Sequence, residues 1–457
     1  MKGIRKNSLL SILLLFVAMP SIGQKELTIE AFVENVKKYH PYIEITNNKL
    51  LKSEYKFKAA AGAFDPKLQA SWNLKNYNGK TYYDQRNAKL KAATRLGISP
   101  IIKYQDNTGY YLNPENGNPT VGLIGAGVEI PLLRGLLIDE ARKDYRIQKL
   151  ANQEQLFSAD STTNYIVAKA LNAYVQWAAA YYKFEALDSL LSFRRARYQN
   201  ILTLYQGGNI PAMDTLDAYT QMQKTQQEYL LIEATMNKKY YKLLAQIWNP
   251  DLYPNTDSLI PQKMEGIIEM LTPTNKALDL TQHNFMRAYD LRKQQQNVMV
   301  RYQKEQYKPK LNVELLPLSA VNDGLGGFRA NNFTTSINIE LPLYYRKQTN
   351  YTKIAKLELE NINCQSIILE RKLNNQYLTL ISNVVLFEKQ YDISLDNVSN
   401  LNVLKTLEED KYVLGESSLI KLNYRENKYM KEKLKSYDVF YKYCNVLIEL
   451  SNLLQVN

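Results

Sequence analysis

Residues able to carry out chemistry are few in this sequence. The chain has two histidines, His40 and His283, and two cysteines, Cys364 and Cys444. No CxxC or HExxH motif accompanies them, so neither pair has the spacing of a metal site. The GxSxG motif of a serine nucleophile is also missing from the sequence. We therefore predict no enzyme activity, no cofactor and no metal.

Three glycines, Gly122, Gly125 and Gly127, superficially resemble a phosphate-binding loop. Such a loop needs a Lys-Ser/Thr partner, which does not follow here. The glycines also lie in a candidate strand, where a missing side chain allows another backbone to approach closely. We therefore expect them to serve packing.

The two cysteines are also candidates for a disulfide. If the helices before and after Gly415 run antiparallel, Cys364 lies 51 residues before the turn and Cys444 lies 29 residues after it. The difference corresponds to roughly 33 Å of helix rise, which is far beyond the reach of a disulfide. We predict two free thiols packed against helices.

The elements that must position these residues occur in two copies. The paired landmarks are His40 with His283, Pro66 with Pro309, Pro131 with Pro342, and Gly208 with Gly415. Their offsets are 243, 243, 211 and 207 residues. The large step of 32 residues indicates an insertion between Pro66 and Pro131 in the first copy. Because the histidines hold equivalent positions, they mark helix starts rather than a metal pair.

Each copy changes from a helical to a strand-like pattern after its first helix. Apolar and polar residues alternate in four stretches of about 9–11 residues, the length of a tilted membrane strand. These predicted strands lie near 67–76, 121–130, 310–316 and 333–342. A strand of a soluble sandwich alternates in the same way, so for each strand by itself both interpretations stay open.

Two long segments without proline or glycine follow the strands. They run from about residue 136 to 205 and from about 344 to 414. Some 70 helical residues form a rod on the order of 100 Å long, which is typical of coiled coils or helical barrels. Glycines end both rods, so we predict helical hairpin tips near 207–211 and 415–418.

The chain is predicted to have four segments. Residues 1–23 are expected to be a signal peptide, because a basic start precedes an apolar core and a small-x-small cleavage site. Residues 24–249 form the first repeat, 250–275 a Pro-rich linker or equatorial segment, and 276–457 the second repeat. After residue 23 no apolar run reaches the roughly 20 residues of a membrane helix, so any membrane crossing would have to use strands.

The inserted segment, 76–119, is predicted to be an enlarged loop between two strands. It is rich in Tyr, Asn, Gly and Lys. Contact with anionic lipid head groups and the plain solubility of an exposed loop both remain open for it.

Charge and tyrosine content favour an envelope surface. The formal net charge is +13, of which the signal peptide carries three positive charges and no negative one, leaving +10. Export argues for an anionic surface rather than nucleic acid as the partner. The 35 tyrosines also suit a membrane interface, since the side chain has a dry and a wet end.

This order of elements resembles the TolC-type outer membrane efflux protein family over nearly the whole mature chain. The resemblance rests on the exported start, the duplicated helix-strand-strand-helix unit, the pairs Pro131-Leu132 and Pro342-Leu343, and the Tyr-x-x-Gly turns at 205–208 and 412–415. Arg134-Gly135 is similar to the family's "PLLRG" stretch. The second copy has Tyr345-Arg346-Lys347 there and lacks the glycine.

The resemblance implies a mainly α fold with a transmembrane β-barrel. Four strands per subunit would enter a shared trimeric barrel in the outer membrane lipid, and coiled-coil-like helices would form a periplasmic tunnel. The implied function is an outer membrane channel subunit of a tripartite efflux or type I secretion system, a passive conduit for small toxic compounds or a secreted polypeptide. A periplasmic adaptor protein, coupled to an inner-membrane pump, would grip the tips at Gly207, Gly208, Gly415 and Glu416. The alternative is a periplasmic coiled-coil scaffold or adaptor that does not insert in the membrane.

The resemblance also implies a periplasmic gate just after the two turns. Asp214 and Asp217 hold that place in the first copy, and they share one helix face because they are three residues apart. Lys421 and Tyr424 stand at the matching positions of the second copy. We hypothesise a gate salt bridge between Asp214 and Lys421. The alternative is that the acids are only solvated residues at a helix start.

Overall fold

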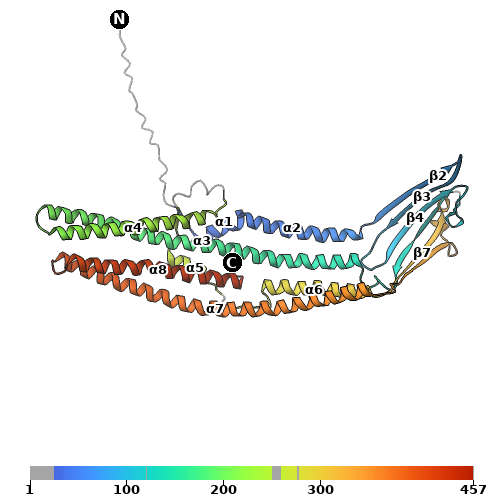
Figure 1. Ribbon diagram of the computed structural model, residues 1–457. Coiled ribbons are helices and arrows are strands. Elements are labelled where there is room, and N and C mark those ends of the chain that lie inside the picture. Colours follow the sequence, from blue (N-terminus) through green and yellow to red (C-terminus); the bar gives the residue numbers. More distant parts are fainter. Residues whose placement is uncertain (1–24, 120, 250–258, 275–276, 456–457) are drawn as a thin grey trace, which may run out of the picture. The chain divides into compact units, whose positions relative to one another are not determined.

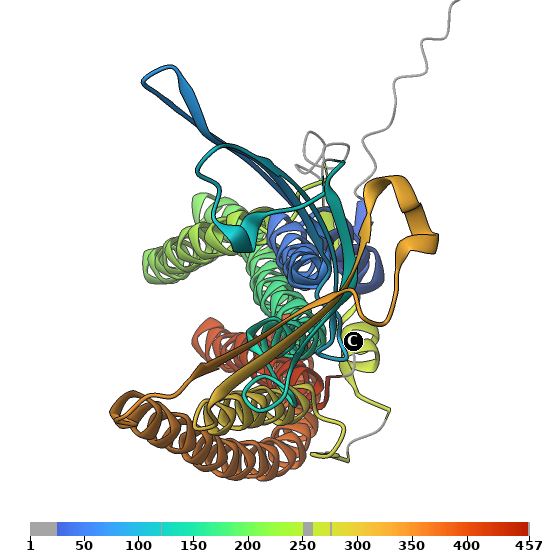
Figure 2. The ribbon, with the colours of Figure 1, turned by 90° about the vertical axis from the view of Figure 1, so that its right-hand side faces the viewer.

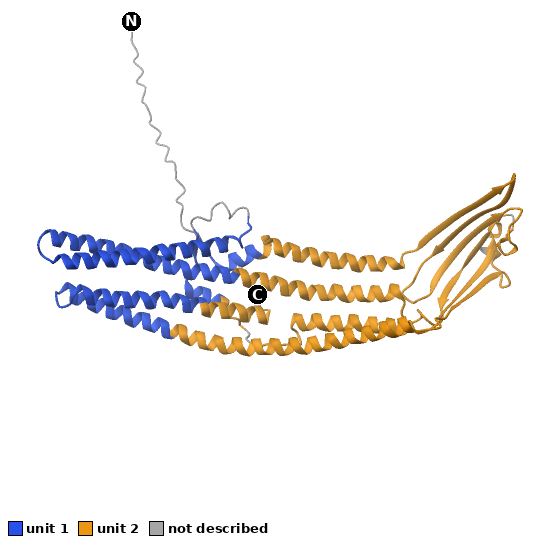
Figure 3. Ribbon diagram, in the orientation of Figure 1, with its two compact units in different colours: residues 1–36, 171–270, 393–441 blue, residues 37–170, 271–392, 442–457 orange. Residues whose placement is uncertain are grey.

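The computed structural model describes residues 25–119, 121–249, 259–274 and 277–455 (Figure 1). The expected signal peptide, 1–23, and the first part of the expected linker lie outside these residues. The chain divides into two compact units (Figure 3). Unit 1 takes residues up to 36, 171–270 and 393–441, and unit 2 takes 37–170, 271–392 and 442–457.

Two long helices contribute to both units. They are α3 (Glu140–Gln206), with 67 residues, and α7 (Arg346–Val413), with 68 residues. Both fall within the proline-free and glycine-free segments of the sequence, where every backbone N–H can join the i→i−4 ladder. Within the described residues, no helix is both long enough and apolar enough to cross a membrane.

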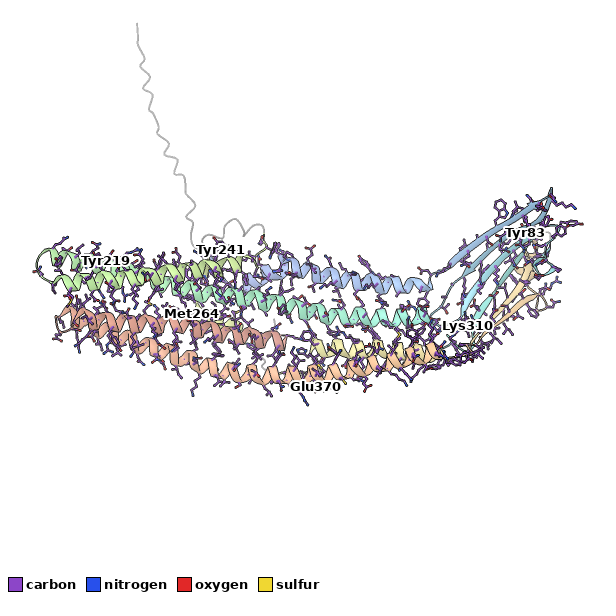
Figure 4. All side chains as sticks on the ribbon, viewed as in Figure 1. Tyr83, Tyr219, Tyr241, Met264, Lys310 and Glu370 are labelled. Carbon is purple, nitrogen blue, oxygen red and sulfur yellow. The ribbon has the colours of Figure 1, made fainter. Side chains whose placement is uncertain are left out.

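One end of unit 2 is an antiparallel sheet of six strands in the order β2-β3-β4-β5-β7-β8 (Figure 3), and the sheet is curled (Figure 2). Its strands are β2 (Lys67–Tyr77), β3 (Lys80–Lys91), β4 (Ser99–Thr108), β5 (Leu123–Pro131), β7 (Lys310–Ala320) and β8 (Phe333–Glu340). Short 3-10 helices, η1 (Gly62–Phe64), η2 (Pro114–Asn116) and η4 (Val321–Gly327), lie at strand connections. Lys310 lies where the sheet meets the helices, and Tyr83 lies toward its other end (Figure 4).

The sheet corrects two expectations. Six strands, not four, belong to it, and the segment predicted as an enlarged loop, 76–119, contains β3 and β4. These strands have no clean alternation of apolar and polar residues, because charged residues occur on both of their faces. The turn that joins β2 to β3 is Asn78-Gly79, where the two residues have positive φ values of 48° and 71°. Asn-Gly is the preferred pair for a two-residue hairpin turn, so this local signal was present.

The remaining helices of unit 2 begin at the two histidines. The first is α2 (Pro41–Ala61) and the second is α6 (Asn284–Glu305). The Nδ1 atom of His40 accepts a hydrogen bond from the Tyr42 N–H at 3.2 Å, and that of His283 accepts from Phe285 at 3.3 Å. Both histidines are therefore N-caps, which explains why they recur at equivalent positions.

Unit 1 combines helices with a two-stranded parallel sheet. The sheet pairs β1 (Lys25–Leu27) with β6 (Leu259–Pro261), and the helices are α1 (Ile29–Tyr39, up to residue 36), α4 (Ala212–Leu244), α5 (Met264–Leu271) and α8 (Leu419–Leu454, up to residue 441). The described part of the expected 250–275 linker therefore forms β6 and α5. Tyr174 ties these pieces together, because its hydroxyl donates to Leu27 and accepts from the Gln262 N–H.

The two cysteines are free, as predicted. Cys444 is fully buried, and burial raises the pKa of its thiol. Cys364 is exposed rather than packed between helices.

Candidate functional site

The sheet of unit 2 exposes its apolar face. Residues paired across neighbouring strands point to the same face, and residues along a strand alternate between faces. One face carries an apolar set that includes Leu68, Trp72, Ile102, Ile337 and Ile339. Leu68 is 71% exposed and Ile337 is 63% exposed. A monomeric protein in water rarely leaves such a continuous apolar surface uncovered, so we expect an apolar phase or a partner to cover this face.

The other face carries the charges and is more shielded. Glu314 of β7 pairs with Lys103 of β4 and lies 3.7 Å from the Nζ atom of Lys89 on β3. Glu129 of β5 pairs with Lys91 at 2.6 Å. The Glu314 side chain is only 13% exposed. The sheet is thus inverted relative to a sheet of a water-soluble protein, where apolar side chains face the shielded side.

Among the residues that the structure describes, neither edge of the sheet has a partner strand. The edge strands are β2 and β8, and all residues of β2 are exposed. In an antiparallel sheet of six strands the two edges run in opposite directions. The β8 edge of one copy can therefore pair antiparallel with the β2 edge of another. Unpaired edges with apolar side chains are templates for such pairing.

One end of the apolar face has a polar and aromatic rim. The Trp72 indole N–H donates to Asp84 at 2.7 Å, and Arg86 binds Asp84 at 2.9 Å. The Arg86 guanidinium also lies 6.0 Å from the centre of the Trp72 ring. Aromatic residues that end an apolar band are typical of the level where lipid meets water.

The two helical hairpins of unit 1 end in matching turns. Gly208 and Gly415 have φ of 75° and 77°. Their N–H groups donate to the carbonyls of Tyr205 and Tyr412 at 2.9 and 3.0 Å. Asn209 and Glu416 each donate to the carbonyl five residues earlier, Leu204 and Lys411. Both turns are therefore Schellman caps, in which only the glycine position demands a special residue.

The two turns lie together in unit 1. Ile201 of α3, Ala218 of α4 and Leu419 of α8 form one buried cluster, against which Tyr412 of α7 packs. Gly207, Gly208, Gly415 and Glu416, the residues expected to contact an adaptor, are all exposed. Apolar side chains beside the turns are exposed as well, namely Met213, Leu216, Val413, Leu414 and Ile420.

The residues of the expected gate lie beside these turns, with a different pairing. Within the described chain, Asp214 and Lys421 form no ion pair. Lys421 is exposed, whereas Asn423, two residues later, faces α4 and donates to Asp217 at 2.9 Å. The hypothesised gate salt bridge does not form within one chain and stays a prediction for the assembled channel. Tyr424 is 60% exposed.

A buried charge network that the sequence did not reveal joins α3 and α4 to α8. The Nη1 and Nη2 atoms of Arg197 donate to the Glu426 carboxylate at 3.0 and 2.5 Å, and Glu426 is 3% exposed. Arg194 lies 3.9 Å from the same carboxylate and donates to Thr225. Burial lowers the pKa of Arg194. No signal in the sequence separates these charges from solvated ones, because their partners are 229 residues away.

Another tip contact connects α7 with the start of α8. Glu408 accepts a hydrogen bond from Ser417 at 2.5 Å, and Arg425 approaches its carboxylate at 3.5 Å. The hydrogen bond from Ser417 is the main reason why the pKa of Glu408 is lowered. Within the described residues, no group of three or more His, Cys, Asp or Glu side chains is placed to hold a metal ion.

Comparison with solved structures identifies the fold. The chain is similar to the CmeC outer membrane channel of Campylobacter jejuni, with a TM-score of 0.66 and 13% identity over 93% of this chain and 85% of that chain. It is also similar to the outer membrane protein VceC of Vibrio cholerae, with a TM-score of 0.64 and 12% identity over 93% and 96%. The same holds for the open state of the MtrE outer membrane channel of Neisseria gonorrhoeae, with a TM-score of 0.64 and 12% identity over 93% and 88%. The chain therefore has the fold of the TolC-type outer membrane efflux channels. No family model matches the sequence, and no curated protein is similar to it.

Proposed function

We propose that this chain is the subunit of an outer membrane channel. It would serve as a passive trans-periplasmic conduit of a tripartite efflux or type I secretion system, for small toxic compounds or a secreted polypeptide. The inverted sheet carries the proposal, because its apolar face is exposed while its charged face is shielded. Lipid would cover the first face and water in a pore would hydrate the second.

The proposed assembly is a homotrimer. Unpaired strand edges are not tolerated within lipid, so the open β2 and β8 edges require partner strands. Pairing β8 of each copy with β2 of the next closes the ring. The helices would extend from the outer membrane into the periplasm.

The proposed partners meet the hairpin tips. A periplasmic adaptor protein would contact the exposed turns at Gly207, Gly208, Gly415 and Glu416 and link the channel to an inner-membrane pump. The exposed apolar side chains around these turns support this placement, since compact apolar patches mark protein contacts. No nucleic acid partner is proposed.

The constriction is proposed to lie just after the turns. Asp214 and Asp217 on α4 and Lys421 and Tyr424 on α8 would ring the pore in a trimer. A negative ring favours cations, and a mixed ring is less selective. Channels with Asp214→Ala or Lys421→Ala should differ from the native channel in conductance or cation selectivity. If neither variant differs from the native channel in conductance or selectivity, this placement is contradicted.

Reconstitution tests the proposed function. The mature protein, added to a planar lipid bilayer, should produce stable conducting channels, and in cells it should fractionate with the outer membrane as a heat-modifiable trimer. Release with the soluble periplasm and no conductance would instead support the coiled-coil scaffold. Ile337→Lys, which places a charge on the apolar face, is the matched variant that should not insert.

A further inference from the structure

The β3–β4 hairpin has no counterpart in the second repeat. In that repeat β7 pairs directly with β8, whereas in the first repeat β3 and β4 lie between β2 and β5. An insertion of this length is expected to fold over the rim as a loop. It instead forms ladders along the whole of β2 and along most of β5.

The outer side chains of the hairpin continue the apolar face of the sheet. One row across four strands joins Leu68, Leu90, Ile102 and Ala126 as successive partners. The next row joins Ala70, Ala88, Tyr104 and Ile124. In these two rows β3 and β4 therefore present the same apolar level as β2 and β5 on either side of them, and Arg86 and Asp106 in the following row belong to the polar rim. A hairpin that remained in water would gain nothing from this match.

The inner side chains of the hairpin complete the charged face. Lys89 and Lys103 are partners on β3 and β4, and both reach Glu314 on β7. Lys103 is opposite Gly125 on β5, which has no side chain of its own to fill this place on the face. Leu316 fills the space instead, since a Cβ at Gly125 would lie 2.5 Å from its Cδ2 atom. Without the hairpin, Glu314 would lose its cationic partners.

The turn between β3 and β4 is anchored where the sheet meets the helices. The Arg95 guanidinium lies 4.4 Å from the centre of the Tyr145 ring on α3 and 5.9 Å from that of Phe64. Gly97 packs against Arg142, whose guanidinium binds the carbonyls of Gly135 and Leu136. The turn end of the hairpin is thus held in line with the other strands.

We propose that the β3–β4 hairpin is part of the membrane wall, with its outer face against lipid acyl chains, so that every copy contributes six strands. This inference rests on the proposed channel function. Three copies of six strands make a barrel of eighteen, whereas four strands each would make twelve. Barrel diameter grows roughly linearly with strand number, so the barrel of eighteen strands is about 1.5 times as wide as one of twelve.

Cysteine accessibility in proteoliposomes tests the wall directly. Ala88 and Asn87 are neighbours on β3 that point to opposite faces, and both are half-buried in the chain. In a Cys364→Ser background, a water-soluble maleimide should label Asn87→Cys on the order of tenfold faster than Ala88→Cys, because lipid excludes water from the outer face. The Cys364→Ser protein without a further substitution should remain unlabelled, since Cys444 is buried.

A control pair on β7 separates the two proposals. Val313→Cys points outward and Asn312→Cys inward. If β7 shows the alternation while Asn87→Cys and Ala88→Cys label equally, the channel stands and the hairpin is not in the wall. If neither strand alternates, the channel proposal itself fails.

Deletion of the β3–β4 hairpin tests the diameter of the barrel. Deleting residues 80–121 leaves Asn78-Gly79 to connect β2 with β5, whose directions already suit a hairpin. The barrel of the variant should be about one third narrower than the native barrel. Neutral polymers added on the extracellular side should therefore be excluded from the variant at a smaller polymer size than from the native channel. An unchanged exclusion limit overturns the proposal. If the deletion variant does not assemble, the labelling pairs decide alone.

Discussion

The sheet of unit 2 and the helical tips of unit 1 both expose apolar side chains and both shield charges, but they do so in different patterns. On the sheet the apolar residues form rows in register across one face, and the charges pair on the other face with side-chain exposures of 13–37%. At the tips the apolar residues gather around two turns, and the Arg197–Glu426 pair is sealed between helices. Even rows suit a fluid lipid phase, whereas a compact patch suits a folded protein partner.

The largest expected effect breaks the sealed network at the tips. Glu426→Ala leaves Arg197 and Arg194 buried without their carboxylate, which should destabilise the protein by about 3–5 kcal/mol. Glu129→Ala on the sheet should cost within about 1 kcal/mol, because Lys91 stays partly exposed. Denaturant unfolding of both variants in detergent measures the difference. Equal losses would mean that the two charge sets are shielded alike.

A charge on the apolar face of the sheet should have the next largest effect. Ile337→Lys should cost about 2–4 kcal/mol when the strand lies in a bilayer. Asn338→Lys, on the opposite face of the same strand, and Ile420→Lys, at the tip, should both insert normally. Yield of the heat-modifiable trimer in the outer membrane reports the outcome. If Ile337→Lys inserts as well as the controls, the apolar rows do not contact lipid.

His283 should make the C-terminal end of α8 sensitive to acid. Its Nδ1 accepts from Phe285, so the neutral ring carries its proton on Nε2, which lies 3.1 Å from the Leu453 carbonyl. Burial lowers the pKa of His283 from 6.5. The folded state therefore binds fewer protons than the unfolded state, and its stability is lost as the pH falls below about 6.5.

Two substitutions of His283 separate capping from titration. His283→Ala should cost about 1 kcal/mol at pH 8 because the cap is lost. His283→Asn should keep the cap and remove the extra loss of stability between pH 7 and 5. Thermal unfolding across this range is the measurement. An unchanged pH dependence in His283→Asn would assign the acid sensitivity to another group.

The smallest expected effect concerns the Glu408–Ser417 contact at the tip. The pKa of Glu408 is lowered by this hydrogen bond, so its stabilisation is present above pH 4.5 and lost as the pH falls through the lowered value. Ser417→Ala should lower the hydrogen-exchange protection factors of the amides near Gly415 at neutral pH, and acid should lower these protection factors in the native protein only. Ser418→Ala, beside it, is the control. Equal exchange in native and Ser417→Ala proteins would show that the contact does not hold the turn.

Local signals in the sequence predicted much of the fold. The rods follow from the absence of proline and glycine, the turns at Gly208 and Gly415 from their need for a positive φ, and the outer strands of each repeat from alternation. The histidines were correctly assigned to helix starts. Each of these features depends on residues within one helical turn or one strand, so sequence order alone carries the information.

The candidate site could be predicted less completely from the sequence. β3 and β4 gave no clean alternation, because lysines lie on one face and Arg86 and Asp106 on the other. The partner of Lys103, Glu314, lies 211 residues away in the chain. The Asp214–Lys421 pairing does not form within one chain, because the helix face toward α4 carries Asn423 instead, so it stays a prediction for the assembled channel. Which side of a helix meets another helix depends on packing angles that no single helix contains.

The sequence by itself determined the repeated helix-strand-strand-helix unit, its caps and its turns, since these are short-range properties of the backbone. Only the tertiary structure decided that the insertion after β2 joins the sheet, that the apolar face of this sheet is the exposed one, and that Arg194, Arg197 and Glu426 meet in a buried network. The charge partners lie some 200 residues apart in the chain, so register and packing, rather than neighbouring residues, set which charges find a partner.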